Sequence, residues 1–197
     1  MSKVNMIPRK DTIVLAAIEA IHASGLQAMS TKAIAKKLGV SESIIFKHFA
    51  KKSDLIIAVL EHFSQYDTAI IETSRARNMQ PREALTYFFT TFAGYYENYP
   101  AITSITQAYD VLGHDPEIGA LVKEIFTRRL RFVQAQIHPT RDAGAAHYEN
   151  RHEDLASIFT GTFHELCLKW RLSGCEFPLR ERVLSTLNVL MDNFGLE

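Results

Sequence analysis

Apolar residues recur at intervals of three and four along most of this chain, and glycine, proline and short polar stretches interrupt the pattern. Each stripe between two interruptions is typical of an amphipathic helix with one buried face. The stripes predict helices over residues 9–24, 31–38, 41–49, 52–75, 81–99, 101–112, 116–137, 149–173 and 179–194. We therefore expect an all-α protein of about nine helices.

Two short helical patterns lie close together in residues 31–55, TKAIAKKLGVSESIIFKHFAKKSDL. Thr31 can cap the first helix, and Gly39 gives the backbone the freedom to leave it. Ser41 can cap the second helix, in which Ile45 and Phe49 are four residues apart and point inward. The face that remains outward consists of Glu42, Ser43, Ile44, Lys47 and His48. This arrangement predicts a helix-turn-helix that binds in a groove of DNA.

Many residues of this stretch occur at the spacing of a known DNA-binding signature. They are Thr31, Ile34, Ala35, Gly39, Val40, Ser41, Ile45, Phe46, His48, Phe49, Lys52 and Leu55. On these residues the chain resembles the TetR (TetR/AcrR-like) family of transcriptional regulators, since agreement at so many positions rarely arises by chance. One departure is Phe46, where the family usually has tyrosine, and the missing hydroxyl removes a phosphate contact.

The resemblance implies a three-helix DNA-binding domain, residues 1–52, followed by a larger helical domain, residues 53–197, for effector binding and dimerisation. It implies contacts to backbone phosphates from Thr31, Phe46, His48 and Lys52. It implies an approach to base edges by Lys32, Glu42, Ser43, Ile44 and Lys47. The expected partner is double-stranded DNA with a palindromic operator, bound by a homodimer.

Charge is distributed unevenly, although the formal net charge is zero. Residues 1–55 hold nine Lys and Arg against four Asp and Glu, which leaves 13 against 18 in the rest of the chain. A basic end suits phosphates, and an acidic body limits non-specific binding to DNA. Glu42 departs from this trend. It could accept a hydrogen bond from cytosine N4 or stabilise the N-terminus of its helix, and both interpretations remain open.

The stretch 52–75 begins with Ser53 as a candidate cap and Asp54 in its first turn. A helix of about 22 residues spans about 33 Å, so a shift at its far end can be felt beside the DNA. The resemblance implies that this helix acts as such a lever. It also implies that the short helix 101–112 moves on induction, although its polar content would equally suit a surface connector.

Aromatic residues are concentrated in residues 88–99. Such a stripe is typical of a core, but tyrosine hydroxyls need partners when buried, and a ligand cavity could supply them. Both interpretations remain open. The candidate ligand-binding residues are Phe63, Tyr66, Phe88, Phe92, Tyr95, Tyr96, Ile105, Tyr109, Phe126 and Phe163. Arg128, Arg129 and Arg131 are most simply a solvated face, although a ligand carboxylate could use one of them.

The last two predicted helices carry wide apolar stripes, and the resemblance implies that they pair with their copies across a twofold axis. Gly161 would permit close approach of the helices. The candidate interface residues are Phe159, Phe163, Trp170, Leu187 and Met191, with an intramolecular core as the alternative for each.

The eight histidines and two cysteines form no recognisable metal or catalytic arrangement. His147 and His152 are five residues apart, and neither His152 nor His164 has the i, i+4 partner that a helical zinc site needs. Cys167 and Cys175 lack partner cysteines at metal spacing. There is no glycine-rich phosphate loop and no Gly-x-Ser-x-Gly turn. We expect no metal, no cofactor and no enzymatic activity.

No apolar run approaches about 18 residues, and residues 1–10 lack the apolar segment of a signal peptide. We expect a soluble, cytoplasmic protein with no membrane contact. The predicted function is a ligand-responsive transcriptional regulator, a repressor released from its operator by a small hydrophobic, aromatic or amphipathic effector. Two alternatives are an architectural or protein-partner adaptor on DNA without an effector, and a helical ligand carrier or enzyme without DNA binding.

Overall fold

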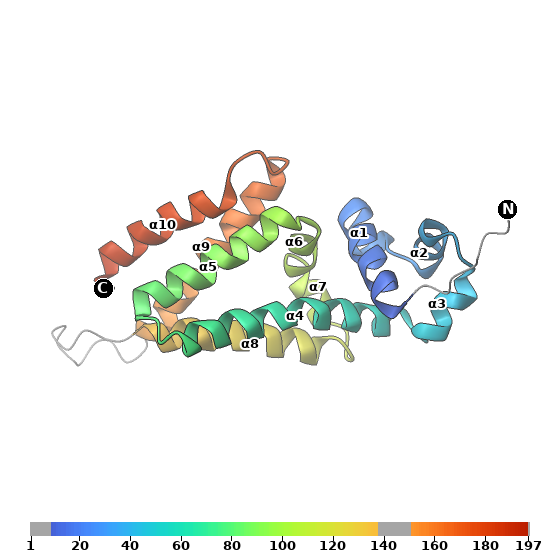
Figure 1. Ribbon diagram of the computed structural model, residues 1–197, viewed down its shortest axis with the longest axis horizontal. Coiled ribbons are helices and arrows are strands. Elements are labelled where there is room, and N and C mark those ends of the chain that lie inside the picture. The colour runs from blue at the N-terminus through green and yellow to red at the C-terminus, as the bar shows by residue number, and fades with distance from the viewer. Residues whose placement is uncertain (1–8, 138–150, 197) are drawn as a thin grey trace.

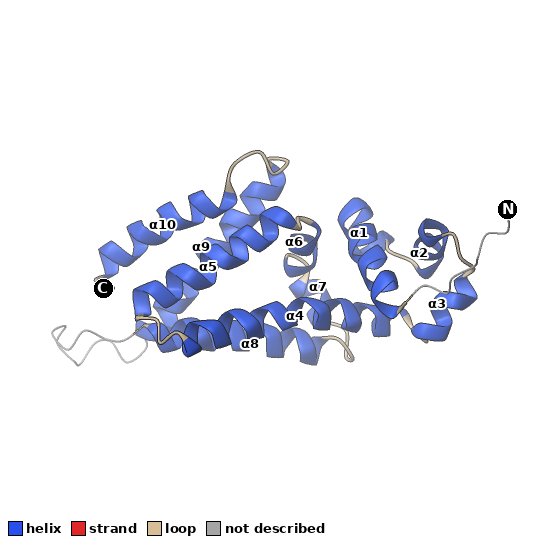
Figure 2. Cartoon of the chain, viewed as in Figure 1, coloured by secondary structure: helices blue, strands red, loops and turns tan. Residues whose placement is uncertain are grey.

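The computed structural model describes residues 9–137 and 151–196, and all regular structure in these ranges is helical (Figures 1 and 2). The ten helices are α1 (Lys10–Ala28), α2 (Thr31–Leu38), α3 (Glu42–His48), α4 (Lys52–Ala76), α5 (Pro81–Asn98), α6 (Ala101–Thr106), α7 (Tyr109–Gly113), α8 (Gly119–Gln136), α9 (Arg151–Leu172) and α10 (Leu179–Phe194). The all-α prediction is confirmed.

The molecule is elongated, with α1, α2 and α3 gathered at one end (Figure 1). Helix α4 starts beside them and runs along one side of the larger body, which α5, α8, α9 and α10 complete. Helices α6 and α7 lie where the two parts meet, and α6 packs against α1. At 25 residues α4 spans about 37 Å, so one helix connects the small end to the far side of the body.

Three helix boundaries differ from the predicted ones. The expected helix 101–112 is two short helices, because the chain turns at Gln107 and Ala108, and this break brings the number to ten. Helix α1 continues past Gly25, which kinks it with a φ of 80°. Helix α8 begins at Gly119 rather than at residue 116, and the Asp115 carboxylate accepts hydrogen bonds from the backbone N–H groups just before it.

The aromatic residues of α5 form much of the core of the larger body. Phe88, Phe89, Phe92 and Tyr96 are all buried. Phe88 stacks on Phe132 of α8 with ring centroids 4.8 Å apart, and it meets Phe92 edge-on at 4.9 Å. Aromatic pairs at these separations stabilise a core beyond their buried area. The α5 stripe therefore packs α5 against α8.

Four of the five candidate interface residues are core residues of the single protomer. Phe159, Trp170, Leu187 and Met191 are at most 3% exposed, because α9 and α10 pack on one another and α10 packs on α5. Side chains already buried in one protomer have little surface left for a partner, and their assignment to a dimer interface stays a prediction. The exposed apolar side chains on these two helices are instead Ile158, Leu172, Leu184 and Val189.

Several sequence-based expectations fall outside the described residues. These are the features of residues 1–8, the loop expected after residue 137, His147 and the first residues of the helix expected from 149. Within the described ranges, no group of His, Cys, Asp and Glu is arranged to hold a metal ion. In those ranges, no helix combines the length and the apolar character needed to cross a membrane.

Candidate DNA-binding surface and ligand cavity

The first three helices form a compact unit because their apolar positions meet in one small core. Ile34 of α2, Ile45 of α3 and Phe49 are buried, and Ile13 and Ala17 of α1 are buried with them. Two predicted caps differ in detail. The α2 cap is Ser30, whose hydroxyl accepts a hydrogen bond from the Ala33 N–H at 3.2 Å, and not Thr31.

The turn between α2 and α3 is made by Gly39, which adopts the left-handed conformation at φ 68°. A side chain at this φ would be strained, so glycine is the residue that lets α3 follow α2 closely. The Ser41 hydroxyl makes no capping bond and instead shares a hydrogen bond with the Ser43 hydroxyl at 2.8 Å. The unit has the geometry predicted for a helix-turn-helix.

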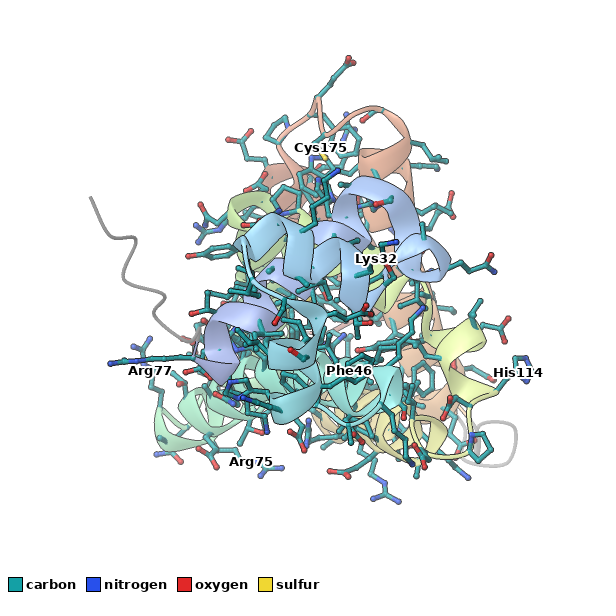
Figure 3. All side chains as sticks on the ribbon, turned by 90° about the vertical axis from the view of Figure 1, so that its right-hand side faces the viewer. Lys32, Phe46, Arg75, Arg77, His114 and Cys175 are labelled. Carbon is teal, nitrogen blue, oxygen red and sulfur yellow. The ribbon has the colours of Figure 1, made fainter. Side chains whose placement is uncertain are left out.

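One face of α3 is exposed and lies at the end of the molecule. Ser43, Phe46 and Lys47 are exposed, with the Phe46 ring 48% exposed. Lys32 of α2 and Phe46 both lie on this end, toward the viewer in Figure 3. Of the other predicted DNA-binding residues, Lys52 is exposed, and Thr31, Glu42, Ile44 and His48 are half-buried. An exposed phenylalanine flanked by lysines is available for contact with DNA.

Thr31 and Glu42 are bonded to each other across the turn. The Thr31 hydroxyl donates to Oε1 of Glu42 at 2.5 Å, which joins the first residue of α2 to the first residue of α3. The carboxylate also lies in the first turn of α3, where the helix dipole favours it. Glu42 therefore helps to hold the two helices together, a role that the sequence did not suggest.

Glu117 of the larger body makes two side-chain hydrogen bonds to the start of α4, where the small end formed by α1, α2 and α3 meets the body. Glu117, in the turn between α7 and α8, accepts hydrogen bonds from the Lys51 ammonium at 2.5 Å and from the Ser53 hydroxyl at 2.7 Å. The hydrogen bond from Lys51 lowers the pKa of Glu117, and the same bond raises the pKa of Lys51. The Ser53 side chain thus contacts the body, and the Asp54 carboxylate accepts from the Lys51 N–H at the start of α4.

A cavity of about 440 Å³ lies in the larger body between α5, α8 and α9, with α6 and α7 at one end. It is lined by Phe88, Phe89, Phe92, Tyr96, Thr106, Tyr109, Phe126, Arg129, Leu130, Ser157, Thr160, Gly161, Phe163, His164 and Cys167. The lining is largely aromatic, and this volume is in the range that holds a small organic ligand.

Six of the ten candidate ligand-binding residues line this cavity: Phe88, Phe92, Tyr96, Tyr109, Phe126 and Phe163. The other four do not line it, and their assignment as ligand-binding residues stays a prediction. Phe63 and Ile105 are buried in the core. Tyr66 and Tyr95 pair with each other away from the cavity, with ring centroids 4.2 Å apart. The spacing of the aromatic residues identified the aromatic faces of the helices. It could not show which of these faces lines the cavity.

A buried ion pair that the sequence did not predict lies beside the cavity, and its arginine, Arg129, is part of the cavity wall. Asp67 of α4 is fully buried, and the Arg129 side chain of α8 is 16% exposed. Arg129 donates from Nε to Oδ2 of Asp67 at 2.6 Å and from Nη2 to Oδ1 at 2.8 Å. Burial alone would lower the pKa of Arg129, but the adjacent carboxylate helps to keep it well above its usual value. Arg129 therefore stays charged.

The three neighbouring arginines have different environments. Arg131 is exposed, and Arg128 is half-buried in an open groove between α4 and α8 that Arg131 also lines. Arg129 instead faces the cavity and Asp67. The expected solvated face describes Arg131 and is wrong for Arg129. Only the apolar spacing around residue 129 could have suggested that it points inward.

Residues 13–59 match the family described as bacterial regulatory proteins, tetR family. This range spans the helix-turn-helix and the start of α4. The DNA-binding domain of the chain is that of the TetR family. The match is to DNA-binding regulators, as the motif in residues 31–55 predicts.

Relatives of this chain are distant. The nucleoid occlusion factor SlmA of Haemophilus influenzae strain PittGG is 23% identical over 146 residues, covering 73% of this chain and 67% of SlmA. The regulator FadR of Bacillus subtilis, solved in complex with stearoyl-CoA, has 19% identity and a TM-score of 0.77 over 92% of this chain and 97% of FadR. The Thermus thermophilus repressor FadR, solved with lauroyl-CoA, has 20% identity and a TM-score of 0.57 over 93% of each chain. The two solved structures share the TetR-family fold.

Proposed function

We propose that this protein is a dimeric repressor that leaves its operator when a small amphipathic effector enters the cavity. The observation that carries the proposal is the aromatic cavity itself, which reaches α6 and α7 through Thr106 and Tyr109. These two short helices lie beside the DNA-binding unit, since α6 packs on α1. A ligand that changes their position has a direct mechanical route to the DNA-binding helices.

The DNA-binding surface supports the first half of the proposal. Two copies of α3 would enter successive major grooves of a palindromic operator, with half-sites about 34–36 Å apart. The proposed domain division is 1–52 for DNA binding and 53–197 for effector binding and dimerisation. Its boundary lies at the start of α4, where Lys51 and Ser53 are held by Glu117. Binding to chromosomal DNA would place the protein in the cytoplasm.

The dimer contact is proposed for the exposed sides of α9 and α10. Ile158 and Leu172 lie on α9, and Leu184 and Val189 lie on α10. Apolar side chains left exposed on two adjacent helices suit a self-complementary contact across a twofold axis.

The class of effector is supported by the chemistry of the cavity and by the two solved neighbours. Phenylalanine rings along most of the wall favour an aliphatic chain or a flat ring. The same fold holds stearoyl-CoA in the Bacillus subtilis FadR and lauroyl-CoA in the Thermus thermophilus FadR. An effector with a fatty tail and a polar head is therefore our proposal.

The test begins with an operator selected from random DNA with the full-length protein, followed by fluorescence anisotropy of the bound duplex. Lauroyl-CoA is expected to weaken operator binding about 5–150-fold, the range of typical coupling energies. Coenzyme A without the acyl chain serves as the control and is expected to have no effect. Ser157→Trp, which places a large ring at the cavity wall, is expected to bind operator but ignore lauroyl-CoA. Gln65→Trp on the exposed side of α4 is the matched control, because Gln65 does not line the cavity.

A second candidate function is a DNA-binding adaptor that acts through a protein partner without an effector. The similarity to SlmA, a nucleoid occlusion factor, favours this candidate. It predicts tight operator binding that no acyl compound changes, and a melting temperature that no such compound raises. The third function considered from the sequence, a carrier or enzyme without DNA binding, is inconsistent with a DNA-binding domain of the TetR family.

Substitution of Glu42 by glutamine separates two roles of this residue in operator binding. If the free carboxylate oxygen accepts a hydrogen bond from cytosine N4, Glu42→Gln is expected to relax selectivity at one base pair per half-site by about 1–3 kcal/mol. The measurement is anisotropy on operators that differ at single positions. Thr31→Val, which removes only the hydroxyl bonded to Glu42, is the matched variant. An equal rise in affinity for all sequences would contradict base reading and leave a structural role.

A further inference from the structure

The buried ion pair determines which polar group the cavity can accept. Arg129 uses Nε and Nη2 to hold both oxygens of Asp67. Because the two charges are at hydrogen-bond distance, the pair presents little net charge to the cavity. The remaining amino group, Nη1 of Arg129, has no hydrogen-bond partner within residues 9–137 and 151–196. Nη1 is therefore a free hydrogen-bond donor at a place where the charges of Arg129 and Asp67 cancel.

The surroundings of Arg129 make this end of the cavity polar but neutral. The guanidinium carbon lies 4.7 Å from the centroid of the Phe92 ring. Burial raises the pKa of Tyr96, of Tyr109 and of Cys167, the last to about 12, so all three side chains stay protonated at neutral pH. Among the described lining residues, none carries a carboxylate. The rest of the wall is mainly phenylalanine.

We propose that this cavity selects a neutral carbonyl, as in the ester, thioester or amide of an aliphatic acid, over the free carboxylate. The inference rests on the proposed function, because it specifies the head group of the effector that the cavity binds. The carbonyl oxygen accepts a hydrogen bond from Nη1 of Arg129, and the acyl chain lies along the phenylalanine wall.

A free carboxylate is disfavoured at the same place for an electrostatic reason. Its charge would lie beside Asp67, which already takes up the positive charge of Arg129. A second carboxylate at Nη1 would therefore lie close to a charge of its own sign, which is more costly than placing a neutral acceptor there. Without Asp67, Arg129 would instead favour a free carboxylate over a neutral carbonyl.

The test compares two probes of equal chain length on the full-length protein by isothermal titration calorimetry at pH 7.5. The probes are the decanoyl thioester of N-acetylcysteamine and sodium decanoate. The thioester is expected to bind at least about tenfold more tightly. This comparison uses the wild-type chain, so it decides the proposal even if a variant does not fold.

Asp67→Asn keeps an oxygen that can accept a hydrogen bond from Arg129 but removes the negative charge. It is expected to raise the affinity for decanoate about tenfold and to leave the affinity for the thioester nearly unchanged. Arg131→Met is the matched control, because Arg131 lies on the same helix, is exposed and does not line the cavity. It is expected to alter neither affinity.

Decanoate binding as tightly as the thioester to the wild-type chain would overturn the selection of a neutral carbonyl and leave the proposed function standing. Failure of both probes to bind would overturn the proposed function itself, since it would show that the cavity takes no acyl ligand. An unchanged probe preference in folded Asp67→Asn would overturn the role assigned to the ion pair.

Discussion

Replacing Arg129 with methionine is expected to lower the free energy of unfolding by about 3–5 kcal/mol, because it leaves the fully buried Asp67 carboxylate without its counter-ion. The two hydrogen bonds between these side chains join α4 to α8 and are shielded from water. The measurement is urea denaturation followed by circular dichroism at a fixed protein concentration, since the proposed dimer would make stability depend on concentration.

Two further variants show whether the loss comes from the unpaired charge. Arg131→Met removes an exposed arginine from the same helix and is expected to change stability by less than about 0.5 kcal/mol. Replacing both partners, as Asp67→Leu with Arg129→Met, is expected to recover most of the stability, because no buried charge then remains. A double variant no more stable than Arg129→Met alone would contradict this explanation.

Replacing Lys47 and Lys52 separately with alanine is expected to change operator binding in two different ways. Lys47 is exposed on α3, so its loss should cost about 1–3 kcal/mol per half-site and relax selectivity at one position. Lys52 is exposed at the start of α4, so its loss should weaken binding to all sequences. In a dimer it should also reduce the slope of log affinity against log salt by about two.

Lys37→Ala is the matched control for both lysine variants. Lys37 is an exposed lysine of α2 whose ammonium pairs with Glu19 of α1. It is expected to have a much smaller effect on selectivity and on the salt slope, both measured by anisotropy at several salt concentrations. If Lys47→Ala lowers affinity equally for every base at every position, Lys47 contacts phosphates and does not read bases.

Local features of the sequence were enough to predict most of the fold. The helix Leu179–Phe194 has the predicted bounds, because Pro178 precedes it and a left-handed Gly195 ends it. The helix-turn-helix was predicted because its turn glycine and buried positions all lie within 25 residues of sequence. Signals of this kind depend on neighbouring residues, which is why the sequence reveals them.

Features that depend on distant residues were the ones missed. Asp67 and Arg129 are 62 residues apart, and nothing in either local sequence predicts their pairing. The apolar stripes of α9 and α10 predicted that one face of each helix is buried. They could not show whether the same protomer or a partner covers that face. Phe159 and Met191 therefore looked equally suited to a dimer contact and to the core in which they lie. An apolar stripe shows that a residue packs against other apolar side chains. It does not show whether those side chains belong to the same protomer or to its partner.

Trp170 gives the protein an optical property that follows directly from its position. It is the single tryptophan of the chain, it is buried, and it lies on α9 one turn after Cys167 of the cavity wall. Tryptophan emission therefore comes from one indole close to the ligand cavity, and none comes from the DNA-binding helices. A change in that emission when operator DNA alone is added would report, without any label, that the DNA-binding end and the cavity respond to each other.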